Sequence, residues 1–209
     1  SGTSLGVLRF GGDGKLNCLQ RVAYGYNRWS QSAMRQWLNS EKGVGEWWTP
    51  QNDFDRCPDQ LATKAGFLTG FDTDFLEILR PTKVITALNT VTDTTSSNSV
   101  DPLETTYDKI YLPALEQMSI EPELAGEGST WEYWKRASNM TTKMKKWQTY
   151  PQIRTFAIEN HTSPQYVRLR SANRGNSCNT WCVYSSGDVD SGHGAAINAS
   201  RCAPACDFC

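Results

Sequence analysis

Seven cysteines are the residues of this sequence with the most obvious capacity for chemistry, and five of them lie within the last 32 residues. They are spaced Cys178-x3-Cys182 and Cys202-x3-Cys206-x2-Cys209. Only Cys206 and Cys209 form a CxxC pair, whereas an ordinary structural zinc site needs a second pair of ligands at similar spacing. The odd number and the crowding also differ from the framework of a disulfide-stapled domain. We therefore expect free or partly paired thiols, and no metal or other cofactor.

Asp188, Asp190 and His193 are further candidates for chemistry. Two carboxylates two residues apart on a strand share one face of the sheet, as a paired-carboxylate site requires. No acid–base partner or substrate-positioning motif accompanies them, and a lone histidine is more often a solvated loop residue than a base. These residues therefore predict no catalytic site.

The composition excludes other classes of protein. The chain has 209 residues, with 21 Lys and Arg, 22 Asp and Glu and a formal net charge of −1, so it lacks the basic surplus that nucleic-acid binding needs. No run approaches the roughly 20 apolar residues of a membrane helix, and residues 1–4 do not begin a signal-peptide pattern. Because 8 Trp, 8 Tyr and 7 Phe supply ample core material, we expect one domain over residues 1–209.

The elements that must position these residues are short and mixed. Ser30 is a suitable N-cap for a helix that reaches Asn39, in which Met34, Trp37 and Leu38 form a buried stripe. Further patterns predict strands at 84–88, 110–112 and 166–170, a short helix at 113–117, a surface loop at 92–100, and a helix with a loop at 131–146. Since no repeat or linker divides the chain, the expected fold class is α+β.

Residues 171–206 differ in composition from the rest of the chain. They contain no Lys, Glu, Gln or Met, although these four types fill 32 of the other 173 positions. Chance leaves a segment of that length empty about once in a thousand trials. Trp181, Val183 and Val189 stand at even offsets on either side of the turn-forming residues 185–187, mostly alternating with polar or small residues. The segment therefore predicts a β-hairpin with one buried and one displayed face.

Three parts of the sequence resemble the variable proteins of diversity-generating retroelements. The most specific part is C-terminal: RSANRGNS at 170–177, then W-x-V-x-S-x-G-x-V at 181–189, then RCAPAC at 201–206. YNRWSQSAMRQWLNS at 26–40 and YDKIYLPALEQM at 107–118 also look like that family. The resemblance thus touches the beginning, the middle and the end of the chain.

This resemblance implies a C-type lectin-like fold of the formylglycine-generating-enzyme branch, with short antiparallel strands, two or more helices and long loops. In that family a reverse transcriptase miscopies adenines of a template repeat, so that AAC and AAT codons become other codons ending in a pyrimidine. Such codons never encode Lys, Glu, Gln, Met or Trp. The residue types absent from 171–206 are among those forbidden, and Trp181 occupies a framework position. Residues 171–206 are therefore expected to be a variable region.

The resemblance also implies which positions are diversified and bind ligand. They are Cys178, Asn179, Cys182, Tyr184, Ser186, Asp188, Asp190, Gly192, His193, Gly194, Ile197, Asn198 and Ser200. Tyr184 would offer a rigid amphipathic contact, and Asp188 and Asp190 would favour a partner with Lys or Arg. The implied partner is a protein or glycan on a host or neighbouring cell, without nucleic acid or membrane insertion. The implied location is a phage virion or a bacterial cell surface.

Two alternative functions stay open. A calcium-dependent carbohydrate-binding lectin would carry Glu-Pro-Asn or Gln-Pro-Asp followed by Trp-Asn-Asp, but the chain has only EPE at 121–123 and QND at 51–53. These fragments do not assemble the about 6–8 oxygen ligands that calcium needs. A formylglycine-generating-enzyme-like thiol oxidase would use a reactive pair such as Cys178 with Cys182 or Cys202 with Cys206. The first pair falls on expected variable positions, and no activating neighbour is evident in the sequence.

Overall fold

A four-stranded sheet in the order β8-β7-β6-β9 carries the C-terminal hairpin. Its strands are β6 (Val167–Ala172), β7 (Asn179–Val183), β8 (Val189–Gly194) and β9 (Arg201–Cys202). The neighbours β6, β7 and β8 are antiparallel, whereas β9 runs parallel to β6. The strand expected at 166–170 and the hairpin expected around 185–187 are confirmed.

The computed structural model describes residues 25–51, 55, 57–93, 101–138, 158–159, 163–164, 166–194 and 201–208. Smaller antiparallel sheets pair β2 (Thr82–Ala87) with β3 (Leu103–Asp108), β1 (Leu79–Arg80) with β10 (Asp207–Phe208), and β4 (Ile158–Glu159) with β5 (Ser163–Pro164). The helices are η1 (Trp29–Gln31), α3 (Ala33–Leu38), α4 (Asp59–Ala62), η2 (Phe67–Gly70), α5 (Thr73–Ile78), η3 (Glu116–Met118) and α6 (Glu132–Ser138). The expected α+β class is confirmed.

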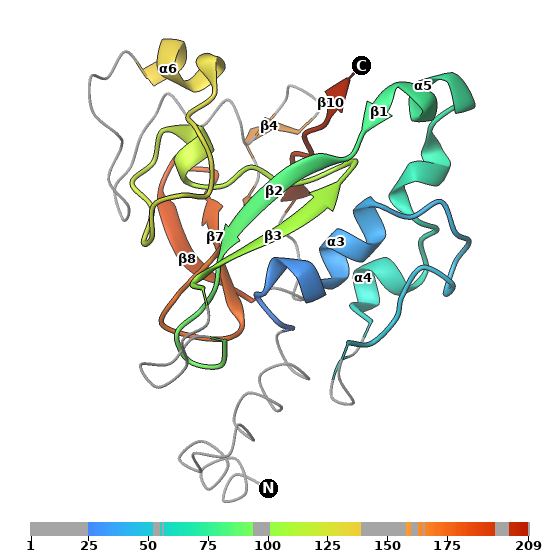
Figure 1. Ribbon diagram of the computed structural model, residues 1–209, viewed down its shortest axis with the longest axis horizontal. Coiled ribbons are helices and arrows are strands. Elements are labelled where there is room, and N and C mark those ends of the chain that lie inside the picture. Colours follow the sequence, from blue (N-terminus) through green and yellow to red (C-terminus); the bar gives the residue numbers. More distant parts are fainter. Residues whose placement is uncertain are drawn as a thin grey trace, which may run out of the picture.

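The β2–β3 ribbon lies between the helices of the first third of the chain and the large sheet (Figure 1). β3 contacts η1, and β2 contacts β6. η1 also contacts β6, so the large sheet meets both the ribbon and the first helical segment. Among the described residues, no helix has the length and apolar character to cross a membrane.

The first helix begins later than the sequence predicts. Ser30 lies in η1, and its hydroxyl donates to Glu104 Oε2 at 2.7 Å, so it caps no helix. The N-cap of α3 is Ser32, whose Oγ accepts the backbone N–H of Arg35 at 3.1 Å. The expected stripe holds: Leu38 is fully buried, while Met34 and Trp37 are partly buried against the same core.

The strand expected at 110–112 is wrong. Only Tyr111 forms an isolated bridge, to Ala205. The backbone of Ile110 bonds instead to the side chain of Asn39, which accepts from Ile110 N at 3.1 Å and donates to Ile110 O at 2.8 Å. Ile110 is buried without a strand ladder because the side chain of Asn39, the C-cap of α3, satisfies its backbone.

Other sequence-based expectations are confirmed in part. The strand expected at 84–88 is observed as Thr82–Ala87, and the short helix expected at 113–117 is the 3-10 turn Glu116–Met118. The helix expected at 131–146 is described only as Glu132–Ser138. The loop expected at 92–100 lies outside the described residues apart from 92 and 93.

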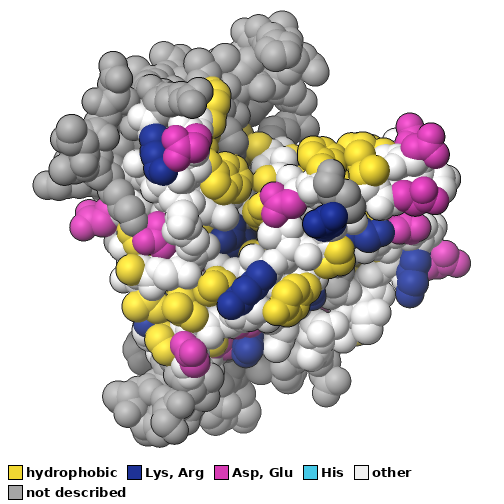
Figure 2. Space-filling model, turned by 45° about the horizontal axis from the view of Figure 1, so that its top comes forward, with side chains coloured by type: hydrophobic (Ala, Val, Ile, Leu, Met, Phe, Trp, Pro, Cys, Tyr) yellow, Lys and Arg dark blue, Asp and Glu magenta, His cyan; other side chains and the backbone are white. Residues whose placement is uncertain are grey.

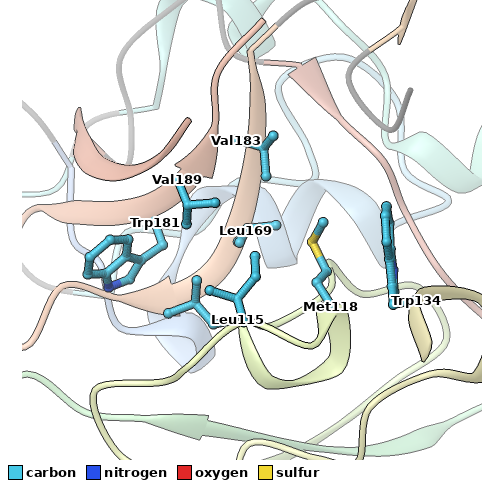
Figure 3. Packing of buried hydrophobic residues seen from close by; sticks show 8 residues of the cluster. Leu115, Met118, Trp134, Leu169, Trp181, Val183 and Val189 are labelled. Atoms are coloured by element: carbon cyan, nitrogen blue, oxygen red, sulfur yellow. The ribbon is translucent and has the colours of Figure 1, made fainter. Parts of the chain in front are cut away.

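Two hydrophobic clusters fill the interior. The first, shown in Figure 3, joins the sheet to η3 and α6 and consists of Leu115, Met118, Ile120, Trp134, Leu169, Trp181, Val183 and Val189. The second packs α3, η2 and β2 together and consists of Trp29, Leu38, Leu68, Leu79, Val84, Ile110, Tyr111 and Leu112. Trp131 packs against both clusters, so one side chain links them.

Carboxylates on one face of β3 hold η1 and α3 in place. Asp108, whose side chain is fully buried, accepts from Arg35 Nε at 2.6 Å and from Trp29 Nε1 at 2.9 Å. Glu104 lies on the same face of β3 as Asp108 and accepts from Arg28 Nε at 2.8 Å. The polar residues of the 26–40 motif are therefore used to position the helix against the ribbon.

Candidate ligand-binding hairpin

The β7–β8 hairpin is closed by a tight turn. Cys182 pairs with Asp190 and Val183 with Val189, and beyond them Tyr184 N donates to Asp188 O at 2.8 Å. Gly187 N donates back to Tyr184 O at 2.9 Å. Gly187 has a φ of +94°, a conformation that residues with a Cβ rarely adopt, and this explains a glycine at the turn.

The inner face of the hairpin belongs to the core. Trp181, Val183 and Val189 are all fully buried, as the sequence predicts, and they belong to the first cluster together with Leu115 (Figure 3). Because side chains alternate along a strand, Cys182, Tyr184 and Asp190 belong to the outer face. Burial of the inner face fixes the register of the outer face, since a shift by one residue would expose Trp181.

Tyr184, Tyr166 and Asp190 form a contiguous group on the outer face. The rings of Tyr166 and Tyr184 meet edge to face, with centroids 4.9 Å apart. The Tyr184 hydroxyl donates to Asp190 Oδ2 at 3.1 Å. Tyr166 is 40% exposed, and Tyr184 and Asp190 are partly exposed. Burial, together with the Cys182 thiol and the Asp190 carboxylate, raises the pKa of Tyr184, so this phenol is neutral and donates at ordinary pH.

Asp188 and Ser186 lie at the tip beside this group. The Ser186 hydroxyl donates to Asp188 Oδ2 at 2.7 Å; Ser186 is exposed and Asp188 is half-buried. The structure thus brings four expected variable positions, Tyr184, Ser186, Asp188 and Asp190, to one accessible end of the hairpin.

Cys178 and Cys182, two of the expected variable positions, do not belong to an exposed surface. Cys178 is 6% exposed and Cys182 is fully buried. Cys182 lies between Asp190 of β8 and Arg168 of β6, and its thiol contacts Asp190 O at 3.3 Å. Burial raises the pKa of Cys178 to about 11 and that of Cys182 to about 12. Neither thiol is activated.

The structure describes the other expected variable positions in less detail. Asn179 is half-buried at the start of β7, and its N–H donates to Asn176 Oδ1 at 2.7 Å. Gly192, His193 and Gly194 belong to β8, in which Thr180 of β7 pairs with His193. The remaining three positions lie outside the described residues: Ile197, Asn198 and Ser200.

The loop 173–179, which precedes β7, is held by residues far away in the sequence. The Asn27 side-chain amide donates to Asn173 O at 3.1 Å and to Asn176 O and Asn179 O at 2.8 Å each. The Asn27 backbone N–H donates to Ser177 O at 3.1 Å. Asn27 is itself buried and is oriented by Asn89, which donates to its Oδ1 at 3.0 Å. The 26–40 motif therefore fixes the start of the hairpin.

Buried arginines support the sheet behind the hairpin. Arg168 stands between Cys202 and Cys182 on neighbouring strands, and its guanidinium donates to Thr180 Oγ1 at 2.9 Å. Burial lowers the pKa of Arg168 to about 10, so it remains charged at neutral pH. Arg170 donates to Leu112 O at 2.6 Å and to Glu127 O at 2.7 Å, which ties β6 to the 112–127 segment.

The sequence interpretation missed Tyr166, Asn27 and Arg168 as parts of the site. Tyr166 and Arg168 are two residues apart in the alternating run at 166–170, which is the signal that could have placed Tyr166 on the outer face. No local signal in the sequence relates Asn27 to a loop about 150 residues later. Among the described residues, no group of three or more His, Cys, Asp or Glu is arranged to hold a metal ion.

Fold and site together define an α+β protein with a half-exposed C-terminal hairpin anchored by its N-terminal third. The family model described as "Domain of unknown function (DUF6273)" matches residues 16–206, and the chain belongs to this family. Neither a curated protein nor a solved structure matches the chain.

Proposed function

We propose that the protein is a variable protein of a diversity-generating retroelement, with a C-type lectin-like fold, whose hairpin surface binds a ligand on a host or neighbouring cell. Residues 171–206 form the variable region, and the protein acts from a phage virion or a bacterial cell surface. It works by recognition and not by catalysis.

One observation carries the proposal: in the segment that lacks Lys, Glu, Gln and Met, the framework residues of the hairpin and the candidate variable positions at its accessible end lie on opposite faces. The framework residues Trp181, Val183 and Val189 are fully buried. Tyr184 and Asp190, which the proposed mutagenesis can reach, are partly exposed. A mechanism that varies Tyr184 and Asp190 alters the surface and leaves these three framework residues unchanged.

The buried thiols argue against Cys178 and Cys182 as the reactive pair of the oxidase alternative. A catalytic cysteine attacks as a thiolate, which requires an accessible position and a lowered pKa. Cys178 and Cys182 have the opposite properties, because burial raises both pKa values. Arg168, the cation beside Cys182, lowers the pKa of this thiol by less than burial raises it.

The genomic neighbourhood tests the proposal. We expect a near-copy of the codons for residues 171–206 beside a reverse-transcriptase gene, with AAC or AAT at the variable positions. Independent isolates should differ at those positions and agree at Trp181, Val183 and Val189. If no such repeat exists, or if the differences fall equally on both sets, the proposal is wrong.

A further inference from the structure

Two tyrosines are in contact at the accessible end of the hairpin. Tyr166 precedes β6 and lies outside 171–206, whereas Tyr184 is an expected variable position. Their rings are in contact, with centroids 4.9 Å apart, so the outer face combines one residue that the proposed mutagenesis leaves unchanged with one that it can replace.

This aromatic pair lies next to a carboxylate. Asp190 Oδ2 accepts from the Tyr184 hydroxyl at 3.1 Å, and Asp190 Oδ1 accepts from Ser191 N. Each carboxylate oxygen can accept more than one hydrogen bond, so Asp190 keeps capacity for a further donor. Asp188 adds a second carboxylate at the tip, bonded to Ser186.

The charge of the region is one-sided. Residues 175–200 contain two aspartates and no Lys, Arg or Glu. Arg168 lies on the same face but is only 4% exposed, and its guanidinium is directed to Thr180, away from the tip. The two arginines of β6 therefore offer no cation at the surface, since Arg170 is also buried.

Aromatic faces beside a carboxylate suit one class of ligand group in particular. A guanidinium or ammonium group is attracted to the electron-rich ring face and also donates charge-assisted hydrogen bonds to the carboxylate. The whole chain has a net charge of −1, and both signs of charge occur across the face seen in Figure 2, with hydrophobic side chains between them. Any preference for cations must therefore come from the hairpin tip itself.

We propose that Tyr166, Tyr184 and Asp190 form a subsite for an arginine or lysine side chain of a protein partner. This inference rests on the proposed function, because it takes the hairpin as the binding surface. It adds that Tyr166, a residue outside the variable region, takes part in binding. Because the proposed mutagenesis does not replace Tyr166, the surface keeps an aromatic contact for ligands.

The test uses short peptides and the intact protein. The probe is acetyl-Gly-Arg-Gly-amide, and its control is the same peptide with citrulline, which replaces the guanidinium by a neutral urea group of similar shape. Binding is followed by NMR on protein with 13C-labelled tyrosine rings, with signals assigned through Tyr→Phe variants. We expect the arginine peptide to bind with a Kd on the order of a millimolar and to shift the signals of Tyr166 and Tyr184. Tyr107, which is 66% exposed on β3, should not respond.

Variants separate the contribution of the Asp190 charge to arginine binding from that of the Tyr166 ring. Asp190→Asn keeps an acceptor for Tyr184 but removes the charge, and Tyr166→Leu keeps apolar volume but removes the ring. Each should weaken arginine binding by about two- to fivefold, the range of an exposed cation–π or charge contact. The matched controls Tyr107→Leu and Asp74→Asn, both at exposed positions, should leave binding unchanged. Circular dichroism verifies folding, and Tyr166→Phe, which keeps the ring, should bind like the wild type.

Three results would overturn the subsite: equal binding of the citrulline peptide, unchanged binding by Asp190→Asn, or no binding of either peptide at 20-fold the expected Kd. A shift of the same tyrosine signals by neutral methyl glycosides alone would assign the subsite to carbohydrate instead. These failures are distinct from failure of the proposed function, which depends on the template repeat. A repeat without an arginine preference removes only the subsite.

Discussion

Trp181 shows how a single side chain attaches the hairpin to the rest of the protein. Its ring is fully buried in the first cluster, and its indole N–H donates to Glu123 Oε1 at 2.9 Å. The apolar surface of the ring is therefore buried, and its one polar atom has a hydrogen-bond partner inside the protein. A change at this position affects packing and hydrogen bonding together.

Replacing Trp181 by Ala should lower the free energy of unfolding by about 3–5 kcal/mol, because a large buried aromatic is lost and a cavity remains. Urea denaturation followed by circular dichroism measures this change. The control Tyr107→Ala removes an aromatic that is 66% exposed, and should change stability by less than about 0.5 kcal/mol. Similar values for the two variants would show that Trp181 is not a core residue.

The buried thiols give a prediction about pH. The pKa of Cys178 is raised to about 11 and that of Cys182 to about 12, so at pH 8 both are almost entirely protonated. Because the thiolate is the reactive form, alkylation by iodoacetamide in the native protein should be slow and should accelerate about tenfold per pH unit below these values. Mass spectrometry of the modified peptides measures the rates. In urea both cysteines should react at an ordinary rate, and equally fast reaction of the native protein would contradict the burial.

At the scale of elements, the loop 173–179 and the segment that holds it act as one unit. Asn27 bonds to four of its carbonyl oxygens, and Thr90 bonds to a fifth, that of Arg174, through its N–H at 2.9 Å and its hydroxyl at 2.8 Å. The position of β7 therefore depends on residues before α3 and after β2 as well as on its neighbours in the sheet.

Asn27→Asp should reveal how much this unit contributes. The carboxylate has nearly the shape of the amide but donates no hydrogen bond, so three loop carbonyls lose a donor in a buried place. We expect a loss of about 2–4 kcal/mol in the free energy of unfolding, measured by urea denaturation. Hydrogen exchange should show loss of protection in β7 before β2 and β3. Uniform loss across all strands would argue against a local role for Asn27.

The alternation of residues along the chain predicted the inner face of the hairpin but not the exposure of its outer face. Period-two spacing is enough to place Trp181 and Val183 together, because it reflects a single strand. Burial of Cys182 depends on its neighbours in the sheet, β6 and β8, and strand alternation does not contain that information. The strand wrongly expected at 110–112 has the same origin, since Asn39, far away in sequence, satisfies the backbone of Ile110. Local elements could be predicted, whereas contacts between distant segments could not.

At the scale of the whole molecule, stability and binding should respond to different residues. The proposed ligand-binding residues at the hairpin tip are partly exposed, whereas the two clusters and the buried arginines hold the fold. A variant that combines substitutions of Tyr184, Asp188 and Asp190 should keep its melting temperature close to that of the wild type, since surface changes usually cost within about 0.5 kcal/mol each.

The same variant should lose or change its binding to host cells, because a few residues carry most of the energy of an interface. Calorimetry and cell-binding assays on one set of variants measure both properties. An ordinary structural domain would show the reverse, with lower melting temperatures at most of these positions and no effect on any ligand.

The hold of Asn27 and Thr90 on the loop has a consequence for how the sequence can evolve. Every bond they make to residues 173–179 ends on a main-chain oxygen, and main-chain oxygens are the same whichever amino acid occupies the position. Substitutions in the loop therefore leave these bonds available, so mutational drift at a position such as Asn179 need not disturb the geometry of the backbone. Because these hydrogen bonds do not depend on side-chain identity, Asn27 and Thr90 can hold the loop while its side chains change. A surface that varies, as proposed here, needs such a support.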